Sequence, residues 1–265
     1  MQFRRLSIHA SAIRALDNNY RQFFFASAMA FQEINLNLRL NAMAMASFEQ
    51  ARATGSYELS TIGHSNMAML DRSLMSKLSE YKDLLRAFLK CPAHANEAAA
   101  IVKFRSSAKQ TIERWNKDKT FGLMKWYRNN ASAHYGFDDH GLGALTKGIG
   151  GETDEREFEI LLHEKLGNTH YTMVEQLLAD KLSELGRDAL DQLEVNSEAT
   201  KRVALDVMAL HHQFVLAVFQ ALKLATDPPV NVNVPPRLLW KTGTKIPLLL
   251  DEGDDAFPAL PEIQN

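Results

Sequence analysis

Proline is almost absent from the first 227 residues, and this absence constrains the fold more than any other feature. Of the eight prolines, one is Pro92 and seven lie between Pro228 and Pro261. A proline inside a helix costs about 3 kcal/mol, so long stretches without proline favour long helices. The sequence therefore predicts a helical domain over residues 1–227 and an extended, partly disordered tail over residues 228–265.

Apolar residues recur at helical spacing through most of this domain, which predicts an all-α bundle. The helices are expected over residues 11–53, 66–89, about 93–117, 121–135, 170–185 and 198–225. Gly55 and Gly63 are expected to separate the first two helices. The buried stripe of the first helix is predicted to run through Ile13, Leu16, Tyr20, Phe24, Ala28 and Phe31. One short strand is expected within residues 158–162.

Composition is that of an ordinary globular chain, with 46% hydrophobic and 23% charged residues and a net charge of −2. Cys91 is the only cysteine, so no disulfide can form within the chain, and a reducing, cytoplasmic location is predicted. No apolar run reaches the ~20 residues that span a bilayer, and no membrane association is predicted. The histidine spacings and the glycine-rich stretch at residues 147–152 match no metal or phosphate-loop motif, so neither metal nor cofactor is expected.

Residues 125–136, KWYRNNASAHYG, form a polar run between helix-forming segments. One interpretation is the C-terminal end of a helix. Lys125 and Arg128 would then complement the helix dipole, and Gly136 would end the helix.

A second interpretation follows from the order of these residues. Arg128 is followed directly by the polar Asn129 and, after five intervening positions, by His134. The string YRNNASAHY resembles the signature of the HEPN superfamily: an arginine, a polar residue directly after it, and a histidine four to six residues on. The RN and AHY pairings around the motif strengthen the resemblance, which covers about fifteen residues.

The resemblance implies a four-helix core with additional helices, a homodimer, and in many members metal-independent cleavage of RNA. It implies catalytic roles for Arg128, His134 and Asn129. The neighbouring residues expected to contact substrate are Asn130, Tyr127, Tyr135 and Lys125. Many members belong to toxin–antitoxin or phage-defence systems, which would supply a neutralising partner protein. Other members are inactive or bind nucleotides.

The residue types suit such chemistry independently of the resemblance. Histidine, with a pKa near 6.5, can give or take a proton at neutral pH, and arginine offers a fork of donors to phosphate oxygens. In one continuous helix, however, six positions place Arg128 and His134 about 240° apart, on different faces. Either the helix starts or bends within the motif, or the motif of a second subunit completes the site.

Basic residues dominate the approach to the motif. Between Lys103 and Arg128 there are eight basic and two acidic residues. Such an excess can attract phosphates, although a solvated helix surface explains it equally well. Three hypotheses therefore remain: a HEPN-type ribonuclease, a non-catalytic nucleotide-binding or dimeric interaction module of the same fold, and an unrelated helical bundle.

Overall fold

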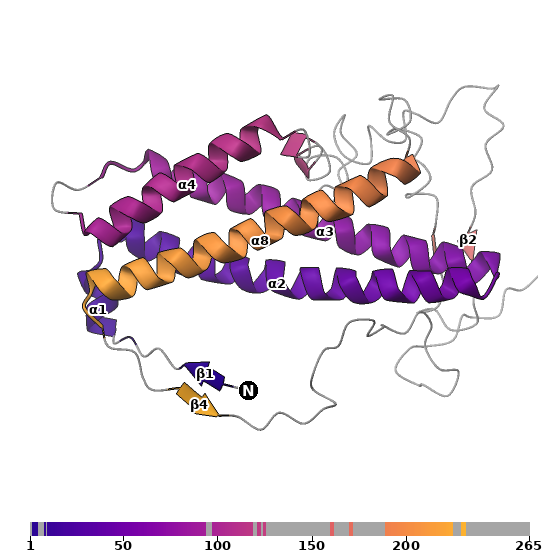
Figure 1. Ribbon diagram of the computed structural model, residues 1–265, viewed down its shortest axis with the longest axis horizontal. Coiled ribbons are helices and arrows are strands. Elements are labelled where there is room, and N and C mark those ends of the chain that lie inside the picture. The colour runs from indigo at the N-terminus through magenta and orange to yellow at the C-terminus, as the bar shows by residue number, and fades with distance from the viewer. Residues whose placement is uncertain are drawn as a thin grey trace, which may run out of the picture. The chain divides into compact units, whose positions relative to one another are not determined.

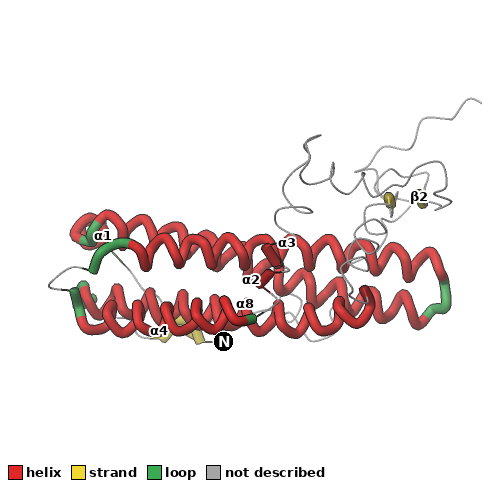
Figure 2. Tube along the Cα trace, turned by 90° about the horizontal axis from the view of Figure 1, so that it is seen from above, coloured by secondary structure: helices red, strands yellow, loops and turns green. Residues whose placement is uncertain are grey.

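The computed structural model describes residues 2–4, 8, 10–93, 97–118, 121–122, 124–125, 160–161, 170–171, 189–224 and 229–231. Most of these residues are helical, as Figure 2 shows, and the predicted all-α class is confirmed. The helices are α1 (Ala10–Ala15), α2 (Asn18–Ala53), α3 (Tyr57–Lys90), α4 (Ala99–Lys117) and α8 (Ala189–Ala221), labelled in Figure 1. Residues 121–122 and 124–125 are also helical.

Two pairs of very short antiparallel strands accompany the helices. β1 (Gln2–Arg4) pairs with β4 (Pro229–Asn231), and β2 (Ile160–Leu161) pairs with β3 (His170–Tyr171). β2 lies where the short strand was expected. The helix predicted from His170 is wrong at its start, because residues 170–171 form β3. Of the predicted tail, β4 is the described part, and its remaining residues lie outside the described ranges.

The first predicted helix is interrupted near its N-terminus. α1 ends at Ala15, and α2 begins at Asn18 after a bend at Leu16 and Asp17. Asp17 caps the new helix, since its Oδ1 accepts a hydrogen bond of 2.8 Å from the backbone N–H of Asn19. The continuous helix predicted from residue 11 is therefore wrong at this point. A carboxylate that satisfies a free N–H starts a helix even inside an apolar pattern.

The turn between α2 and α3 is much shorter than predicted. Gly55 lies in this turn with a positive φ of 74°, a conformation that glycine adopts without strain. Ser56 caps α3, because its Oγ accepts a 3.2 Å hydrogen bond from the N–H of Leu59. Gly63 lies inside α3, where an added Cβ would come within 3.1 Å of the Cα of Phe48 on α2. This glycine permits close packing of two helices, and the predicted helix break at Gly63 is wrong.

The chain folds as two compact units. Unit 1 comprises residues 1–36, 76–125 and 199–242, and unit 2 comprises residues 37–75, 126–198 and 243–265. Each unit contains part of α2 and part of α3.

Four phenylalanines, one from each of four helices, form the centre of unit 1. Phe23 of α2 stacks on Phe88 of α3 at 4.2 Å between ring centroids. Phe214 of α8 lies 4.8 Å from Phe23 and 4.9 Å from Phe104 of α4. All four rings are at most 3% exposed. Of the stripe predicted for α2, Tyr20 is buried as expected, but Phe23 rather than Phe24 lies at the centre.

Unit 2 contains a buried polar contact between the same two helices. The amide nitrogen Nδ2 of Asn41 on α2 lies 3.5 Å from Oδ1 of Asp71 on α3, and both residues are buried. Burial raises the pKa of Asp71 from its ordinary value of 3.8 to about 7, and the nearby Arg72 opposes this rise. The carboxyl group is therefore partly protonated at neutral pH.

We expect Phe214→Ala to lower the free energy of unfolding by about 3–5 kcal/mol, because the lost ring leaves a cavity among three other rings. Urea denaturation followed by far-UV circular dichroism measures the change. Phe25→Ala is the matched control, since Phe25 is 55% exposed, and its effect should stay below about 1 kcal/mol. Equal effects of the two substitutions would contradict the assignment of Phe214 to the core.

We expect Asp71→Asn to stabilise the protein above pH 7 and to leave its stability nearly unchanged at pH 4. The folded wild type keeps a proton on Asp71 that the unfolded chain loses between pH 4 and 7, so wild-type stability falls across that window. The asparagine variant lacks this loss, which amounts to a few kcal/mol.

The measurement is the free energy of unfolding from pH 4 to 8, with Glu49→Gln, an exposed carboxylate of the same unit, as control. Parallel pH profiles for Asp71→Asn and wild type would contradict the shifted pKa.

Candidate functional site

The motif predicted as the site begins just beyond the described part of unit 1. Lys125, the first of the predicted site residues, is helical and exposed. The other predicted residues lie outside the described ranges: Tyr127, Arg128, Asn129, Asn130, His134 and Tyr135. The candidate site is therefore built from the described residues that lead into the motif.

The chain turns sharply between α4 and the motif. The N–H of Phe121 donates a 3.2 Å hydrogen bond to the carbonyl of Asp118, and helical residues follow. Phe121 and Met124 are buried, and the Phe121 ring lies 5.0 Å from the ring of Trp115. Lys125 is exposed, so the described part of this run has a buried side, with Phe121 and Met124, and an exposed side.

Lys82 of α3 lies under this run. Its Nζ is 4.0 Å from the centroid of the Phe121 ring, within the range of a cation–π contact, and the residue is 8% exposed. Burial, with the repulsion of Arg86 and Lys125, lowers the pKa of Lys82 to about 8, while Asp83 and Asp118 oppose this fall. A substantial neutral fraction of Lys82 is thus present slightly above neutral pH.

Arg86 lies one helical turn after Lys82. Its Nη2 donates a hydrogen bond to Oδ1 of Asn116 on α4, and its Nη1 is 3.9 Å from Oδ1 of Asp83. The Asn116 contact holds the guanidinium on the side of α4.

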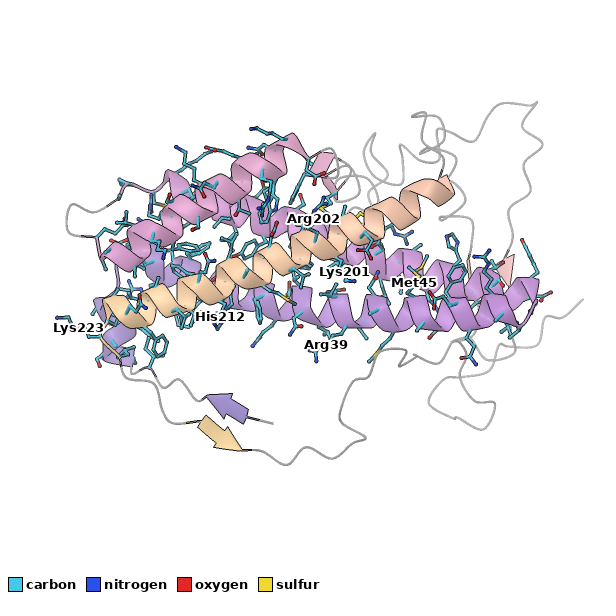
Figure 3. The ribbon with its side chains drawn as sticks, viewed as in Figure 1. Arg39, Met45, Lys201, Arg202, His212 and Lys223 are labelled. Atoms are coloured by element: carbon cyan, nitrogen blue, oxygen red, sulfur yellow. The ribbon has the colours of Figure 1, made fainter. Side chains whose placement is uncertain are left out.

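Two carboxylates tie the end of α4 to α8. Asp206 Oδ2 accepts hydrogen bonds from Arg114 Nη2 at 2.6 Å and from Trp115 Nε1 at 3.0 Å. Asp118 Oδ2 accepts a hydrogen bond of 2.8 Å from Nη2 of Arg202, which Figure 3 labels on α8. These contacts hold the C-terminal end of α4 against α8, and Lys125 and the motif follow this end in the chain. Trp115, 1% exposed, is the buried member of this network.

The basic stretch predicted from the sequence divides among different roles. Arg105 donates hydrogen bonds to the carbonyls of Cys91 at 2.6 Å and Leu89 at 3.3 Å, so it caps the end of α3. Arg114 binds Asp206, whereas Lys109 is exposed. Two basic side chains of this stretch, Arg105 and Arg114, are therefore engaged by contacts within the chain.

Lys82 and Arg86 were missed by sequence reasoning, because they lie about 40 residues upstream of the motif. The sequence held only a weak signal for Lys82. It directly follows Tyr81, a member of the apolar stripe of α3, so a cation lies at the border of the buried face of this helix.

Other kinds of site find little support in the described residues. No group of three or more histidine, cysteine, aspartate or glutamate side chains within the described ranges can hold a metal ion. Residues 198–221 of α8 are long and apolar enough to cross a membrane, but half of that stretch is buried, and core helices meet the same criteria.

Comparison of the chain with models of protein families, with curated proteins and with solved structures gives no match.

We expect Lys82→Met to raise the free energy of unfolding at pH 7 by about 1 kcal/mol, a figure reduced for solvent screening. The folded protein disfavours the charged form of Lys82. Between pH 8 and 10.5 the folded chain has lost a proton that the unfolded chain still binds, so wild-type stability increases with pH across this window. The advantage of the variant should therefore shrink toward pH 10. Urea denaturation at pH 7 and 10 measures it.

Lys90→Met, at an exposed position of the same helix, is the matched control and should show no such pH dependence. If Lys82→Met proved less stable than wild type at pH 7, the contact with Phe121 would outweigh the cost of burial.

Proposed function

We propose that this protein is a metal-independent endoribonuclease of the HEPN type, with Arg128 and His134 as catalytic residues and Asn129 beside them. The observation on which this proposal rests is the motif RNNASAH itself. In the sequence it follows a helical run in which Lys125 is exposed and Phe121 packs on Lys82. A cation-rich approach suits a polyanionic substrate such as RNA.

The helical architecture supports the same proposal. A HEPN-type core contains four helices, and in unit 1 the helices α2, α3, α4 and α8 each contribute one ring to the phenylalanine centre. The proposal places residues 228–265 outside this core as a proline-rich tail. It also places the protein in the cytoplasm, with a toxin-like or defence-like role and a neutralising partner protein.

The proposed chemistry divides between the two ionisable residues of the motif. His134 exchanges protons with the 2′-hydroxyl or the leaving oxygen, and Arg128 stabilises the charge on the phosphorane. The 240° between them in a regular helix requires either a break in that helix or a composite site at a homodimer interface. We propose the composite site.

A second candidate function is a non-catalytic module of the same fold that binds a nucleotide. The observation that favours it is the basic character of the chain before the motif, with eight basic and two acidic residues between Lys103 and Arg128, because such an excess attracts a phosphate whether or not RNA is cleaved. This module would bind nucleotides without cleaving RNA.

We expect the purified protein to cleave RNA in EDTA and His134→Ala and Arg128→Ala to reduce the rate at least 100-fold, because a proton-transfer group or the phosphorane cation is lost. Gel-resolved cleavage of a mixed pool of RNAs measures the rate. His212→Ala and Arg52→Ala, both at exposed positions, are matched controls and should retain activity. Absence of cleavage by wild type across the pool would favour the nucleotide-binding module.

Mixing the two inactive variants tests the composite site. If each site takes Arg128 from one subunit and His134 from the other, every heterodimer has one intact site of two. Random exchange makes about half of the dimers heterodimers, so about a quarter of wild-type activity returns. If one chain supplies both residues, mixing restores no activity.

A further inference from the structure

Two neighbouring helices of unit 1 expose large apolar side chains. The rings of Phe31 on α2 and His211 on α8 stack at 4.7 Å between centroids, and both residues are partly exposed. α2 and α8 therefore meet along a seam that reaches the surface. The exposed large apolar residues in the described parts of these two helices are Phe25, Met29 and Leu36 of α2 and Leu205 and Leu216 of α8. We call these five residues the apolar face.

The spacing of these residues places them in a line along each helix. Leu36 follows Phe25 by eleven positions, and Leu216 follows Leu205 by the same number. Eleven residues make about three full turns, so each line extends for about 16 Å along one side of its helix. The buried residues that lie two positions before the ends of these lines are Phe23, Ile34, Val203 and Phe214. Two positions are about 200° of rotation, so each helix has one apolar side in the core and another on the surface.

Both helices keep their charged side chains away from the apolar face. Among residues 22–38, Glu33 is the only Asp, Glu, Lys or Arg, and its carboxylate is paired with a lysine of α3 at 3.0 Å. Among residues 203–222, Asp206 is the only one, and it binds Arg114 of α4 at 2.6 Å. The cores of protein–protein interfaces are likewise depleted of charge and enriched in aromatic residues and methionine.

The lack of charge determines which partner suits this face. In a two-fold symmetric dimer the same patch occurs on both sides, so a charged patch would place like charges opposite each other. The apolar face can meet a second copy of itself without that cost. A polyanion or a charged peptide would find no complementary charge there.

The area of the face is also sufficient for a dimer. Half-exposed side chains of this size each present about 100 Å² of surface, so the five residues present about 500 Å² per chain. A stable interface buries about 800 Å² per partner. Polar neighbours on the same sides of the helices can supply the remainder. Gln32 and His212, both exposed, follow Phe25 and Leu205 by seven positions, and Figure 3 labels His212 on α8.

We propose that the apolar face is the surface through which two copies of this chain associate. The interface rests on the proposed function only in that a composite site needs two copies, since the observations on α2 and α8 hold equally for a non-catalytic module. Leu205 lies about one helical turn after Arg202, whose Nη2 donates a 2.8 Å hydrogen bond to Asp118. One end of the face therefore lies near the turn from which the chain continues toward the motif.

Methionine oxidation tests whether the face is covered in solution. Met29 is 64% exposed, and Met69, on α3 in unit 2, is 53% exposed, so a monomer should oxidise at both positions at similar rates. We expect hydrogen peroxide to oxidise Met29 about fivefold more slowly in the dimer than in the monomer, and Met69 to change less than about twofold. Sedimentation velocity of the full chain at several concentrations identifies monomer and dimer, and peptide mass spectrometry measures the oxidation.

Substitutions test the same face without oxidation. We expect Met29→Lys and Leu205→Lys each to raise the dissociation constant of the dimer at least about 100-fold, because each places unpaired charges in the interface. Val102→Lys adds the same charge to unit 1 at a position of α4 that is 49% exposed. This matched control should stay within about threefold of wild type. Far-UV circular dichroism confirms that each variant is folded.

Protection of Met29 in the dimer, together with weaker association of both lysine variants, supports the interface. A dimer in which Met29 reacts as in the monomer, or which Val102→Lys weakens equally, overturns it. A chain that stays monomeric at every concentration also overturns it, and protection of Met29 in that monomer would show that another segment of the same chain covers the face. Neither measurement depends on cleavage, so a dimer that leaves RNA intact retains the interface and contradicts only the ribonuclease.

Discussion

Unit 1 depends on the contact of Phe23, Phe88, Phe104 and Phe214, because these rings join α2, α3, α4 and α8. Helices of this length gain little stability from hydrogen bonding alone in water, and packing of an apolar face holds them. Packing of the four rings fixes how each helix is rotated about its own axis. The rotation of a helix in turn determines which of its other side chains face the interior.

The charged residues inside the fold follow from those rotations. Lys82 is six positions before Phe88 on α3, and its place under Phe121 is a consequence of how α3 is seated by the ring cluster. In unit 2, α2 and α3 also bury a polar contact, in which Nδ2 of Asn41 lies 3.5 Å from Oδ1 of Asp71. Burial disfavours the charged forms of Lys82 and Asp71, so the pKa values of both side chains move toward 7. Helix packing thus creates groups that change charge near physiological pH.

Parts of the fold were predictable from local signals alone. The buried face of α4, from Ile101 to Trp115, follows the predicted period, because a short helix with alternating charged residues leaves one apolar face. In α2, the burial of Tyr20 was predicted correctly and that of Phe24 wrongly, since Phe23, Phe24 and Phe25 are adjacent and the pattern cannot choose among them. Gly63 was misread for a related reason: a glycine that permits close helix packing looks, in sequence, like one that ends a helix.

The sequence by itself determined the helical class, because the lack of proline and the 3.6-residue period are local properties of the chain. It also determined the candidate motif at residues 128–134, since the order of residue types needs no neighbours to be recognised. Only the tertiary structure decided that Lys82 of α3 contacts the ring of Phe121, a residue that precedes the motif along the chain. The physical reason is that packing brings together residues some 40 positions apart, and no periodicity in the chain encodes that distance.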